Sequence, residues 1–390
     1  IEDKNVLKRY ELGKNKHREA PQVLFIERCL QLLRPGGRMA IVLPDGIFGN
    51  PGQRDVVGYI LAKSRVMAVV SLPPETFLPS THTKTSVLFL EKKPSEGSKI
   101  FMAIAEKVGH DKNGKIIYKM RPSGEYILDA QGQRIQDDDL PEITRKYKAF
   151  RNGEENTRNH LGFVVEEADI RDNILIPGYY DPELDEALER LEKTGEYNLV
   201  SIGDLAKEGL ISMNRGHEIG SRYYGMGPVP FVRTSDIVNW EIKFDPVKSV
   251  PEEIYLAYKD KQDIRENDIL LVTDGTFLIG RSAIVTSLDT KIVIQSHIKK
   301  IRCLKPDILH PYLLLYLLNT EIVQRQIRAK TFVQATISTI GGRLNEIILP
   351  IPRSSHEIAR IIKEIGEIIR LKREARERME RLVKNGGQDG

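Results

Sequence analysis

Apolar side chains in the first hundred residues recur at helical spacing and then gather into short strand-like runs. Helices are predicted over 21–33 and 53–62, where apolar residues fall on one face. Strands are predicted at Met39–Leu43, Met67–Ser71 and Ser86–Leu90. The nearly continuous apolar run of the first strand is typical of a parallel strand buried on both faces. The order of elements predicts an open α/β sheet. The predicted elements would make up about half of a doubly wound sheet.

A second apolar pattern begins near Leu199 and predicts a different architecture. Short β-like runs are separated by turn residues, and two helical stretches, 311–318 and 322–329, lie among them. The runs are Val229–Val232, Asp268–Thr273, Ser282–Val285, Lys291–Ile294, Ile298–Ile301 and Glu346–Leu349. This part is predicted to be an irregular, strand-rich α+β domain.

Spacings of three and four predict one long coiled-coil-like helix near the end of the chain. Its apolar seam is Ile358, Ile361, Ile365, Ile368, Ala375, Met379 and Leu382, broken once by Lys372. An isolated helix cannot bury such a seam, so we expect packing against another long helix, from a missing part of this chain or from a second protomer. The alternating charges alone are typical of a solvated amphipathic helix, which is the alternative.

These patterns predict four segments. The first is an α/β part over 1–95, and an accessory or linker segment over 96–198 follows, with a highly charged stretch at 137–160. The strand-rich domain is expected over 199–355 and a spacer or dimerisation helix over 356–384.

Composition and charge narrow the possible settings. The longest apolar runs fall short of the roughly 18 residues that cross a bilayer. A net charge of +4 means that any nucleic-acid surface must be a local patch. Cys29 and Cys303 lie far apart without nearby His ligands, which fits a reducing cytoplasm and excludes a structural zinc knuckle. The chain begins at Ile1 rather than Met, so we expect a piece of a longer protein.

The run Phe25–Ile47 resembles a stretch of adenine-N6 DNA methyltransferases, specifically the modification subunit of type I restriction-modification systems. Val69–Phe77 followed by Thr83–Leu90 extends the resemblance in the same order. It implies that residues 1–95 are the later strands of a Rossmann-like methyltransferase sheet, with S-adenosylmethionine as the cofactor of the complete enzyme. It also implies a missing N-terminal methylase half as a partner.

Four stretches in the second half resemble a target recognition domain of a restriction specificity subunit. They are Pro230–Asp236, Asp268–Gly275 with Ile279–Arg281, Gln295–Lys300 and Gly342–Pro352, the last leading into the long helix. The resemblance implies that this part binds double-stranded DNA and reads its sequence. It also implies that the helix serves as a spacer or docks a second protomer or a restriction or specificity subunit.

The residues that define catalysis in the methyltransferase family are absent from the sequence. An Asn-Pro-Pro-aromatic loop holds the flipped adenine in that family. Gly49–Gly52 carries only Asn-Pro, after the wrong strand, and Leu72–Glu75 has two prolines but no Asn. A Gly-rich cofactor loop after a first strand is missing too. We therefore expect this chain alone to bind no cofactor and to be inactive.

Two residues after the strand Met39–Leu43 are candidates for the edge of a target-base pocket, because ligands of open α/β sheets bind at the carboxyl ends of strands. Asp45 could line that pocket or cap a helix, and Phe48 could stack on a flipped base or be a buried loop aromatic. The loop Pro79–Lys84 could contact phosphates or be a solvated hairpin loop.

The candidates for reading DNA are polar and basic residues at strand ends in the second half. Forked arginine donors suit guanine, whereas amides and carboxylates suit adenine and cytosine. The candidates are Arg233, Thr234, Ser235, Thr273, Asp274, Thr276, Arg281, Ser296, His297, Lys299, Lys300, Lys330, Thr331, Gln334, Thr336 and Arg343. The alternative is that many of them are ordinary surface charges. His297 has no other ligand at metal-binding spacing, so no metal site is predicted.

The sequence thus favours a component of a restriction-modification system that couples sequence-specific DNA recognition to adenine-N6 methylation. This chain would carry the reader and only part of the methylase. The alternative is a non-catalytic DNA-binding or assembly protein with a vestigial methyltransferase half.

Overall fold

The computed structural model describes residues 1–390 except 82, 94–96, 155–157, 276–277, 335–336 and 387–390. Contacts between residues divide the chain into two compact units. Unit 1 comprises Ile1–Asp185 and Phe332–Thr336, and unit 2 comprises Glu186–Thr331 and Ile337–Gly390. Both combine helices with sheets, and each has its own core.

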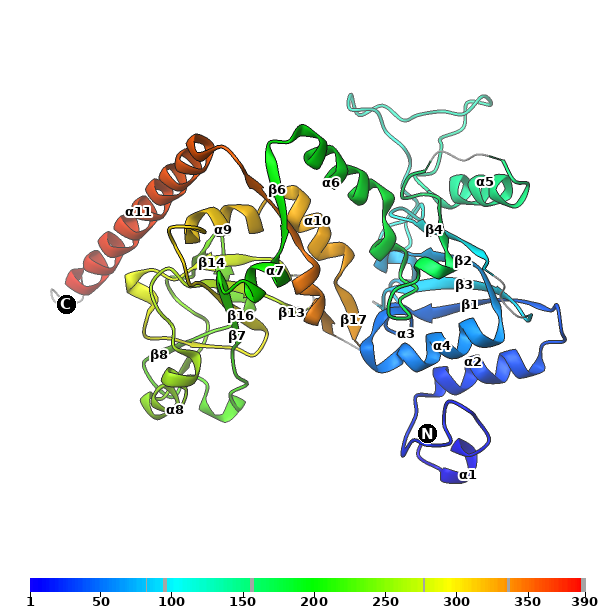
Figure 1. The fold of residues 1–390 in the computed structure, drawn as a ribbon, viewed down its shortest axis with the longest axis horizontal. Coiled ribbons are helices and arrows are strands. Elements are labelled where there is room, and N and C mark those ends of the chain that lie inside the picture. The colour runs from blue at the N-terminus through cyan, green and yellow to red at the C-terminus, as the bar shows by residue number, and fades with distance from the viewer. Residues whose placement is uncertain (82, 94–96, 155–157, 276–277, 335–336, 387–390) are drawn as a thin grey trace. The chain divides into compact units, whose positions relative to one another are not determined.

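Unit 1 is a five-stranded sheet with helices on both faces (Figure 1). Its strands are β1 (Arg38–Pro44), β2 (Arg65–Ser71), β3 (Thr85–Glu91), β4 (Lys99–Ile104) and β5 (Phe163–Glu166), in the order β1-β3-β2-β4-β5. Its helices are α1 (Lys4–Leu7), α2 (Pro21–Leu32), α3 (Asp45–Gly49), α4 (Arg54–Lys63), α5 (Leu140–Arg151) and the start of α6 (Pro182–Thr194). Both long helices and all three strands predicted before residue 95 are confirmed to within two residues.

Alternation along the strands divides the core of unit 1 into two layers. Val69 and Met102 belong to the cluster that includes Ile60 of α4. Phe101, the neighbour of Met102 along β4, packs instead with Ile143 of α5. Helices therefore cover both faces of the sheet, as the α/β pattern predicted.

The prediction that Met39–Leu43 is a parallel strand buried on both faces is wrong. β1 is the edge strand of the sheet and runs antiparallel to β3. Its exposure alternates, so that Val42 is 47% exposed while the neighbouring Leu43 is 3% exposed. The apolar run is misleading because β1 keeps apolar side chains on a face that is open to solvent in unit 1.

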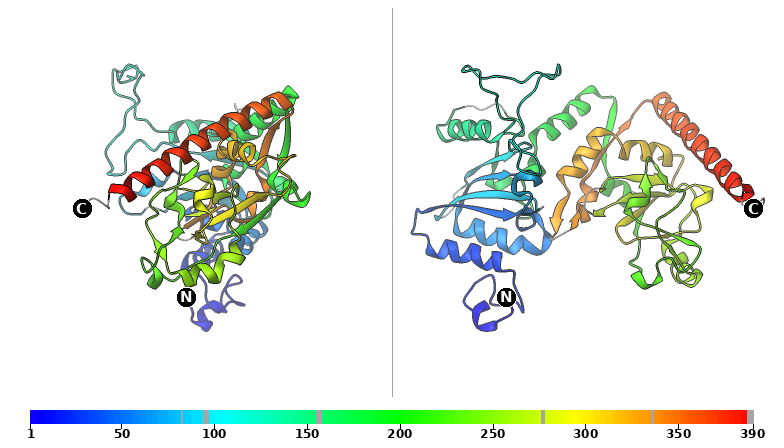
Figure 2. Two further views of the ribbon diagram at one scale, coloured as in Figure 1. Left: turned by 90° about the vertical axis from the view of Figure 1, so that its left-hand side faces the viewer. Right: turned by 180° about the vertical axis from the view of Figure 1, so that it is seen from behind.

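Unit 1 continues past residue 95, where the sequence placed the end of the α/β part, because two further strands join its sheet. β4 runs parallel to β2, and β5 runs antiparallel to β4. The charged stretch at 137–160 contains α5, which packs on the sheet through Ile143 and Phe150. Between β4 and α5, residues 106–139 form tight hairpins that protrude from unit 1 (Figure 2).

Unit 2 is built on the antiparallel sheet β14-β12-β16-β7, with smaller sheets beside it. Its strands are β6 (Tyr197–Ser201), β7 (Ile211–Arg215), β8 (Val229–Val232), β9 (Ile237–Val238), β10 (Glu241–Ile242), β11 (Ser249–Val250), β12 (Ile269–Val272), β13 (Asp274–Gly275), β14 (Ser282–Ile284), β15 (Val293–Ile294), β16 (Ile298–Cys303), β18 (Ile337–Thr339) and β19 (Ile348–Pro352). Its helices are α7 (Ile202–Lys207), α8 (Glu252–Gln262), α9 (Pro311–Leu318), α10 (Glu321–Ala329) and α11 (Ser355–Gly386), while β17 (Phe332–Gln334) falls in unit 1.

The strand-rich character predicted for this part is confirmed, as are the two inserted helices, α9 and α10. Among the described residues, no helix of either unit is long and apolar enough to cross a membrane. Both cysteines are free thiols, and burial raises the pKa of Cys303 to about 12.

The long helix α11 packs within unit 2 along a seam that differs from the predicted one. Ile361, Ile365 and Ile369 are buried in the same cluster as the residues of α9. Ile368, predicted to lie in the seam, is 40% exposed. The buried isoleucines follow one another at every fourth position, where the heptad pattern would take a step of three after Ile365, because the packing against α9 decides which face of α11 is covered. For Ile361 and Ile365 the partner is thus the short α9, not another long helix.

A largely buried charge network ties the C-terminus of α8 to the central sheet. The guanidinium of Arg302 on β16 donates to both oxygens of Asp268, at 2.7 and 2.8 Å, and to Asp263 at 2.7 Å. Lys300 Nζ donates to the carbonyls of Gln262 and Asp263, at 2.6 and 2.8 Å. Asp263 ends α8 in the left-handed conformation, with a φ of 44°. Cations at a helix C-terminus satisfy its last carbonyls and its dipole.

We expect Ile365→Asp to lower the free energy of unfolding by on the order of 3 kcal/mol, because it places a charge in an apolar contact. Ile368→Asp is the matched control on the same helix and should cost far less, because its side chain already meets solvent. Urea unfolding measures both. Equal losses would mean that α11 packs along the predicted seam.

The pKa of Asp263 is lowered to about 2, chiefly by its hydrogen bond from Arg302 and then by that from Arg265. Its contribution to stability is therefore complete above the unfolded-state pKa of about 3.9 and is lost as the pH falls through the folded value. We expect Asp263→Asn to reduce the change in the free energy of unfolding between these two pH values. Asp260→Asn, which removes an exposed carboxylate from the same helix, is the matched control, and the difference between the two pH profiles measures the contribution of Asp263. Identical pH profiles for the two variants would contradict this assignment.

Candidate nucleic-acid interface

One end of the central sheet of unit 2 collects polar residues from four strands. The N–H of Val272, at the end of β12, donates to the carbonyl of Arg281, at 2.9 Å. The next N–H, that of Thr273, donates to the carbonyl of His297, at 3.0 Å. On β16, Lys299 lies opposite Arg215 of β7. Several of the predicted DNA-reading residues therefore share one edge.

Charged side chains at this edge pair with one another. Arg215 Nη2 lies 3.3 Å from Asp274 Oδ2, and the Thr273 hydroxyl donates to the same oxygen, at 2.9 Å. Burial lowers the pKa of Lys299, while the nearby Asp274 opposes that shift. Ser296 Oγ donates to Glu218, at 2.8 Å. The edge thus presents forked donors and carboxylates together, which are the groups that distinguish base pairs in the major groove.

Sequence reasoning missed Arg215 and Glu218. Arg215 ends the strand β7, and Glu218 follows three residues later. The available signal was the run Ile211–Arg215, which passes from apolar to polar residues and is followed by a glycine. This run was not among the predicted strands, and its pairing with β16 depends on a register that the sequence does not reveal.

A second group of predicted residues contains buried polar atoms without a partner. The N–H of Gln295 donates to the carbonyl of Val232, at 2.9 Å, which places Arg233 beside the loop before β16. Arg233 Nε, Ser235 Oγ and His297 Nδ1 are buried and have no hydrogen-bond partner within the described part of the chain. Such atoms are rare in folded proteins, and each requires an explanation such as a bound water or a ligand.

Two of the predicted DNA-reading side chains point into the fold instead. Lys300 is buried, and its ammonium donates to the last carbonyls of α8, so this side chain is engaged inside the fold. The guanidinium of Arg343 is likewise occupied, because it donates to the carbonyls of Lys330 and Thr339, at 2.7 and 3.0 Å. Both side chains satisfy buried backbone carbonyls, whose desolvation would otherwise be costly.

Lys330 and Thr331 also make local contacts. Lys330 pairs with Glu346 at 2.9 Å, and the Thr331 hydroxyl donates to the carbonyl of Ile327 at 2.7 Å. Thr234 is half-buried in a short turn after β8, and Arg281 is exposed. Outside the described part of the chain lie Thr276, Thr336 and the side chain of Gln334.

In unit 1, Asp45 follows β1 directly, where the sequence placed the edge of a base pocket. The residue is 2% exposed, and its carboxylate accepts a hydrogen bond from Ser86 Oγ at 2.7 Å. Lys84 Nζ, from the loop before β3, lies 3.6 Å from its other oxygen. Phe48 is fully buried in the core, as in the alternative of a buried loop aromatic, so stacking on a base would require it to leave the core.

The residues around β1 do not fit an S-adenosylmethionine cradle. A Cβ on Gly49 would lie 2.4 Å from Ile176 and 2.6 Å from Phe332, so this glycine allows close core packing rather than the approach of a ligand. Both carboxylate oxygens of Asp45 are already engaged. Among the described residues, no group of three or more His, Cys, Asp or Glu side chains is arranged to hold a metal.

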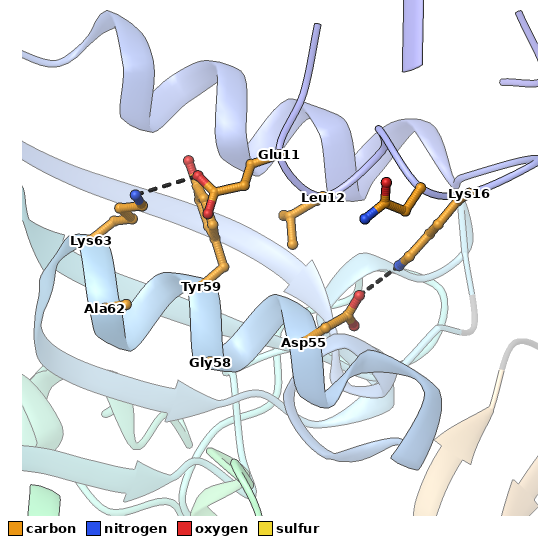
Figure 3. Close-up of a pocket in the computed structure, with 9 residues that line it drawn as sticks. Glu11, Leu12, Lys16, Asp55, Gly58, Tyr59, Ala62 and Lys63 are labelled. Carbon is orange, nitrogen blue, oxygen red and sulfur yellow. Dashed lines mark hydrogen bonds and ion pairs between the residues drawn. The ribbon is translucent and has the colours of Figure 1, made fainter. Parts of the chain in front are cut away.

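A hollow of about 450 Å³ lies in unit 1 between the N-terminal segment and α4 (Figure 3). Two ion pairs flank it, Lys16 with Asp55 at 2.7 Å and Lys63 with Glu11 at 3.3 Å. Burial, together with nearby carboxylates including that of Glu11, raises the pKa of Tyr59 in its wall to about 12. The charges in this hollow neutralise one another, so it offers no chemistry that singles out a ligand.

Two family models match the chain, one over each half. Residues 2–182 match the N-6 DNA Methylase family, and residues 194–381 match the Type I restriction modification DNA specificity domain. A curated relative, the Type I restriction enzyme EcoEI methylase subunit of Escherichia coli, is 34% identical over 70 residues. That stretch is 18% of this chain and 14% of the relative, so the match spans only a small part of the relative's length.

Solved structures of restriction-modification proteins resemble parts or most of the chain. The type IIG restriction endonuclease BpuSI is 11% identical, with 88% of this chain and 44% of that chain covered and a TM-score of 0.36. The Type-I restriction-modification system S subunit from M. genitalium is 17% identical, with 48% of this chain and 41% of that chain covered and a TM-score of 0.32. The HsdS subunit from Thermoanaerobacter tengcongensis is 12% identical, with 89% of this chain and 92% of that chain covered and a TM-score of 0.27.

Proposed function

The chain joins an N-6 DNA methylase segment to a type I restriction modification DNA specificity domain, and on that basis we propose that unit 2 reads a DNA sequence for an adenine-N6 methyltransferase. The observation that carries the proposal is the polar edge of the central sheet in unit 2. There, the Arg215–Asp274 pair lies on the same edge as His297, whose buried Nδ1 has no hydrogen-bond partner among the residues that the structure describes. DNA bound at this edge would supply hydrogen-bond partners from its base edges.

The proposed reading residues are those at or near this edge. They are Arg215, Glu218, Arg233, Thr234, Ser235, Thr273, Asp274, Arg281, Ser296, His297 and Lys299. Arginine would recognise guanine with its two parallel donors, and Asp274 would accept a hydrogen bond from the amino group of cytosine. The Arg215–Asp274 pair would have to open for either contact, so binding exchanges one ion pair for two base contacts. Thr276, Gln334 and Thr336 stay predictions from the sequence.

The methylase segment is proposed to be the later part of a Rossmann-like sheet. Its parallel pair β2–β4, with helices on both faces, supports this assignment. S-adenosylmethionine would be the methyl donor of the complete enzyme, which the N-6 DNA methylase family implies. In this chain Asp45 would hold the end of β1 in place through Ser86 rather than touch the reacting groups.

The helix α11 is the proposed spacer and docking element. Its first turns are buried within unit 2, but Leu371, Met379 and Leu382 are 51, 50 and 67% exposed. An exposed apolar stripe on a long helix is a surface for another helix. A second protomer or a restriction or specificity subunit would cover it.

Residues 199–355 are the proposed DNA-reading domain, and residues 356–384 are the proposed spacer helix. The accessory segment at 96–198 contributes β4 and β5 to the sheet that begins before residue 95. It would therefore complete the methylase segment structurally while adding the hairpins of 106–139 to it.

We expect Arg233→Ala and Arg281→Ala each to cost roughly 1–3 kcal/mol in DNA binding and to relax preference at one base position. Selection from a randomised duplex library by the 390-residue chain measures the preference. Arg343→Ala is the matched control: it should lower the melting temperature, because it leaves two backbone carbonyls without their donor, and keep the parental site.

The contrary result would be a uniform loss of affinity in every arginine variant with the parental site kept. Phosphate contacts alone behave in that way, because they carry no sequence information. Such a result would place the reader outside the edge of the central sheet.

We expect the chain alone to show no stoichiometric binding of S-adenosylmethionine and no methyl transfer to DNA, because the cofactor loop and the Asn-Pro-Pro-aromatic loop are absent from its sequence. Isothermal titration and transfer of a tritiated methyl group measure the two activities. Stoichiometric binding would contradict the assignment of residues 1–95 to the later strands. The non-catalytic alternative would be favoured by two results together. The chain would bind DNA sequence-selectively without methylating it, and its upstream coding region would also lack both loops.

A further inference from the structure

The hairpin arm of unit 1, residues 106–139, repeats one turn three times. In each turn the carbonyl of the first residue accepts a hydrogen bond from the N–H of a glycine three positions later. The N–H of that first residue donates to the carbonyl of the residue four positions later. The turns are 111–115, 121–125 and 129–133. Their glycines, Gly114, Gly124 and Gly132, have φ between 76° and 87°, which residues with a Cβ rarely adopt. The arm is therefore a built structure rather than an irregular loop.

Two closed rings of backbone hydrogen bonds hold the three hairpins together. In the first ring the N–H of Ile117 donates to the carbonyl of Gly109, and the N–H of Gly109 donates to the carbonyl of Asp137. The N–H of Asp137 donates back to the carbonyl of Ile117, and the three distances are 2.9 to 3.0 Å. The second ring closes in the same way through Lys119, Ile135 and Ile127, at 2.8 to 3.0 Å. Each ring satisfies its own donors and acceptors, so the arm keeps its form with little apolar core.

The hairpin arm exposes apolar side chains instead of burying them. Ile116, Met120 and Leu128, one beside each turn, are 50, 53 and 53% exposed. Residues 110–139 are all described, and none of them is buried. Arg134 lies over the ring of Tyr126, 4.1 Å from its centroid. Exposed apolar side chains on a structured, protruding segment are a feature that contact surfaces share.

Several acidic side chains of the hairpin arm are engaged in its turns and at its base. The carboxylate of Asp111 accepts the N–H groups of Lys115 and Asn113, at 2.9 and 2.8 Å, and these bonds lower its pKa. Asp129 accepts two turn N–H groups in the same way, at 2.9 and 2.8 Å. At the base, Asp139 accepts two backbone N–H groups and Asp137 pairs with Lys107.

Three lysines of the hairpins stay available to a ligand, unlike Lys107 at the base. The side chains of Lys112, Lys115 and Lys119 make no ion pair or hydrogen bond within the part of the chain that the structure describes. Between residues 110 and 136, five Lys or Arg residues stand against three Asp or Glu residues, whereas the base of the arm, 106–109 and 137–139, has one basic and four acidic residues. The protruding part of the arm is therefore positively charged as well as apolar, which favours an anionic partner with an apolar surface of its own.

We propose that the hairpin arm binds the backbone of double-stranded DNA and adds affinity without reading sequence. The inference rests on the proposed function, because it takes DNA to be the ligand of the chain. Lysines of the arm would contact phosphates, and the exposed side chains of Ile116, Met120 and Leu128 would lie against the minor groove. Basic residues combined with apolar wedges are how DNA-bending proteins contact that groove. A protein surface is the competing partner, and the experiment decides between them.

The test measures binding of the 390-residue chain to a fluorescent duplex of about 30 base pairs, which spans roughly 100 Å, over a range of salt concentrations. The arm variant combines Lys112→Gln, Lys115→Gln and Lys119→Gln. The control combines Lys4→Gln, Lys8→Gln and Lys14→Gln, exposed lysines at the N-terminal end of the same unit. We expect the arm variant to lower the slope of log affinity against log salt by about 2 to 3 and the affinity at about 0.1 M salt by at least about tenfold. The control should match the wild type, and the selected base sequence should not change.

A second variant, with Ile116→Ser, Met120→Ser and Leu128→Ser, separates the two kinds of partner. Weaker DNA binding supports the proposal, whereas unchanged DNA binding would overturn it, and an accompanying loss of self-association in sedimentation would assign the surface to protein. An arm-lysine variant that binds like the control would overturn the inference while leaving the proposed function intact. A wild-type chain that binds no duplex would overturn both.

Discussion

The fold of unit 2 depends on placing positive charges at the end of one helix. α8 ends at a left-handed Asp263, and its last carbonyls point into the protein, where the Lys300 ammonium takes the place of water. Lys300 and Arg302, two residues apart on β16, reach these carbonyls and the carboxylates of Asp263 and Asp268. Losing one member would leave the others without a counter-charge, which costs more than the intact pair contributes. The network therefore fixes β16 against α8, and β16 is the strand on which the proposed DNA-reading edge begins.

The elements of both units follow from the sequence more closely than the direction of their side chains does. Helix and strand positions depend on local periodicity, which a single sequence contains. The side of a strand that a residue faces depends on register with partners far away in the chain. Lys299 and Lys300 illustrate the difference: adjacent residues in a strand face opposite sides, so only one of them could reach the edge. Register places Lys299 opposite Arg215, while Lys300 turns toward α8.

Three features of the structure lay beyond sequence reasoning for related physical reasons. That the α11 seam continues from Ile365 to Ile369 rather than to Ile368 depends on which face of the helix the folded chain packs against α9. The inward turn of Arg343 depends on two carbonyls that only the folded chain brings within reach. The hairpin arm is held by backbone hydrogen bonds, which leave almost no pattern in side-chain hydropathy. Its sequence signal was a glycine near the end of each turn.

The open edge of β1 affects how the chain behaves at high concentration. No described strand of unit 1 pairs with the outer side of β1, and Val42 adds an exposed apolar side chain there. Unpaired strand edges act as templates for other strands, including those of identical molecules. Arg38 at one end and Pro44 at the other limit such a template to the few residues between them, because a charge and a missing N–H both oppose extension of the ladder. The residues between Arg38 and Pro44 are therefore a place where unit 1 can pair with a strand of another molecule, and a strand added beside β1 would cover them.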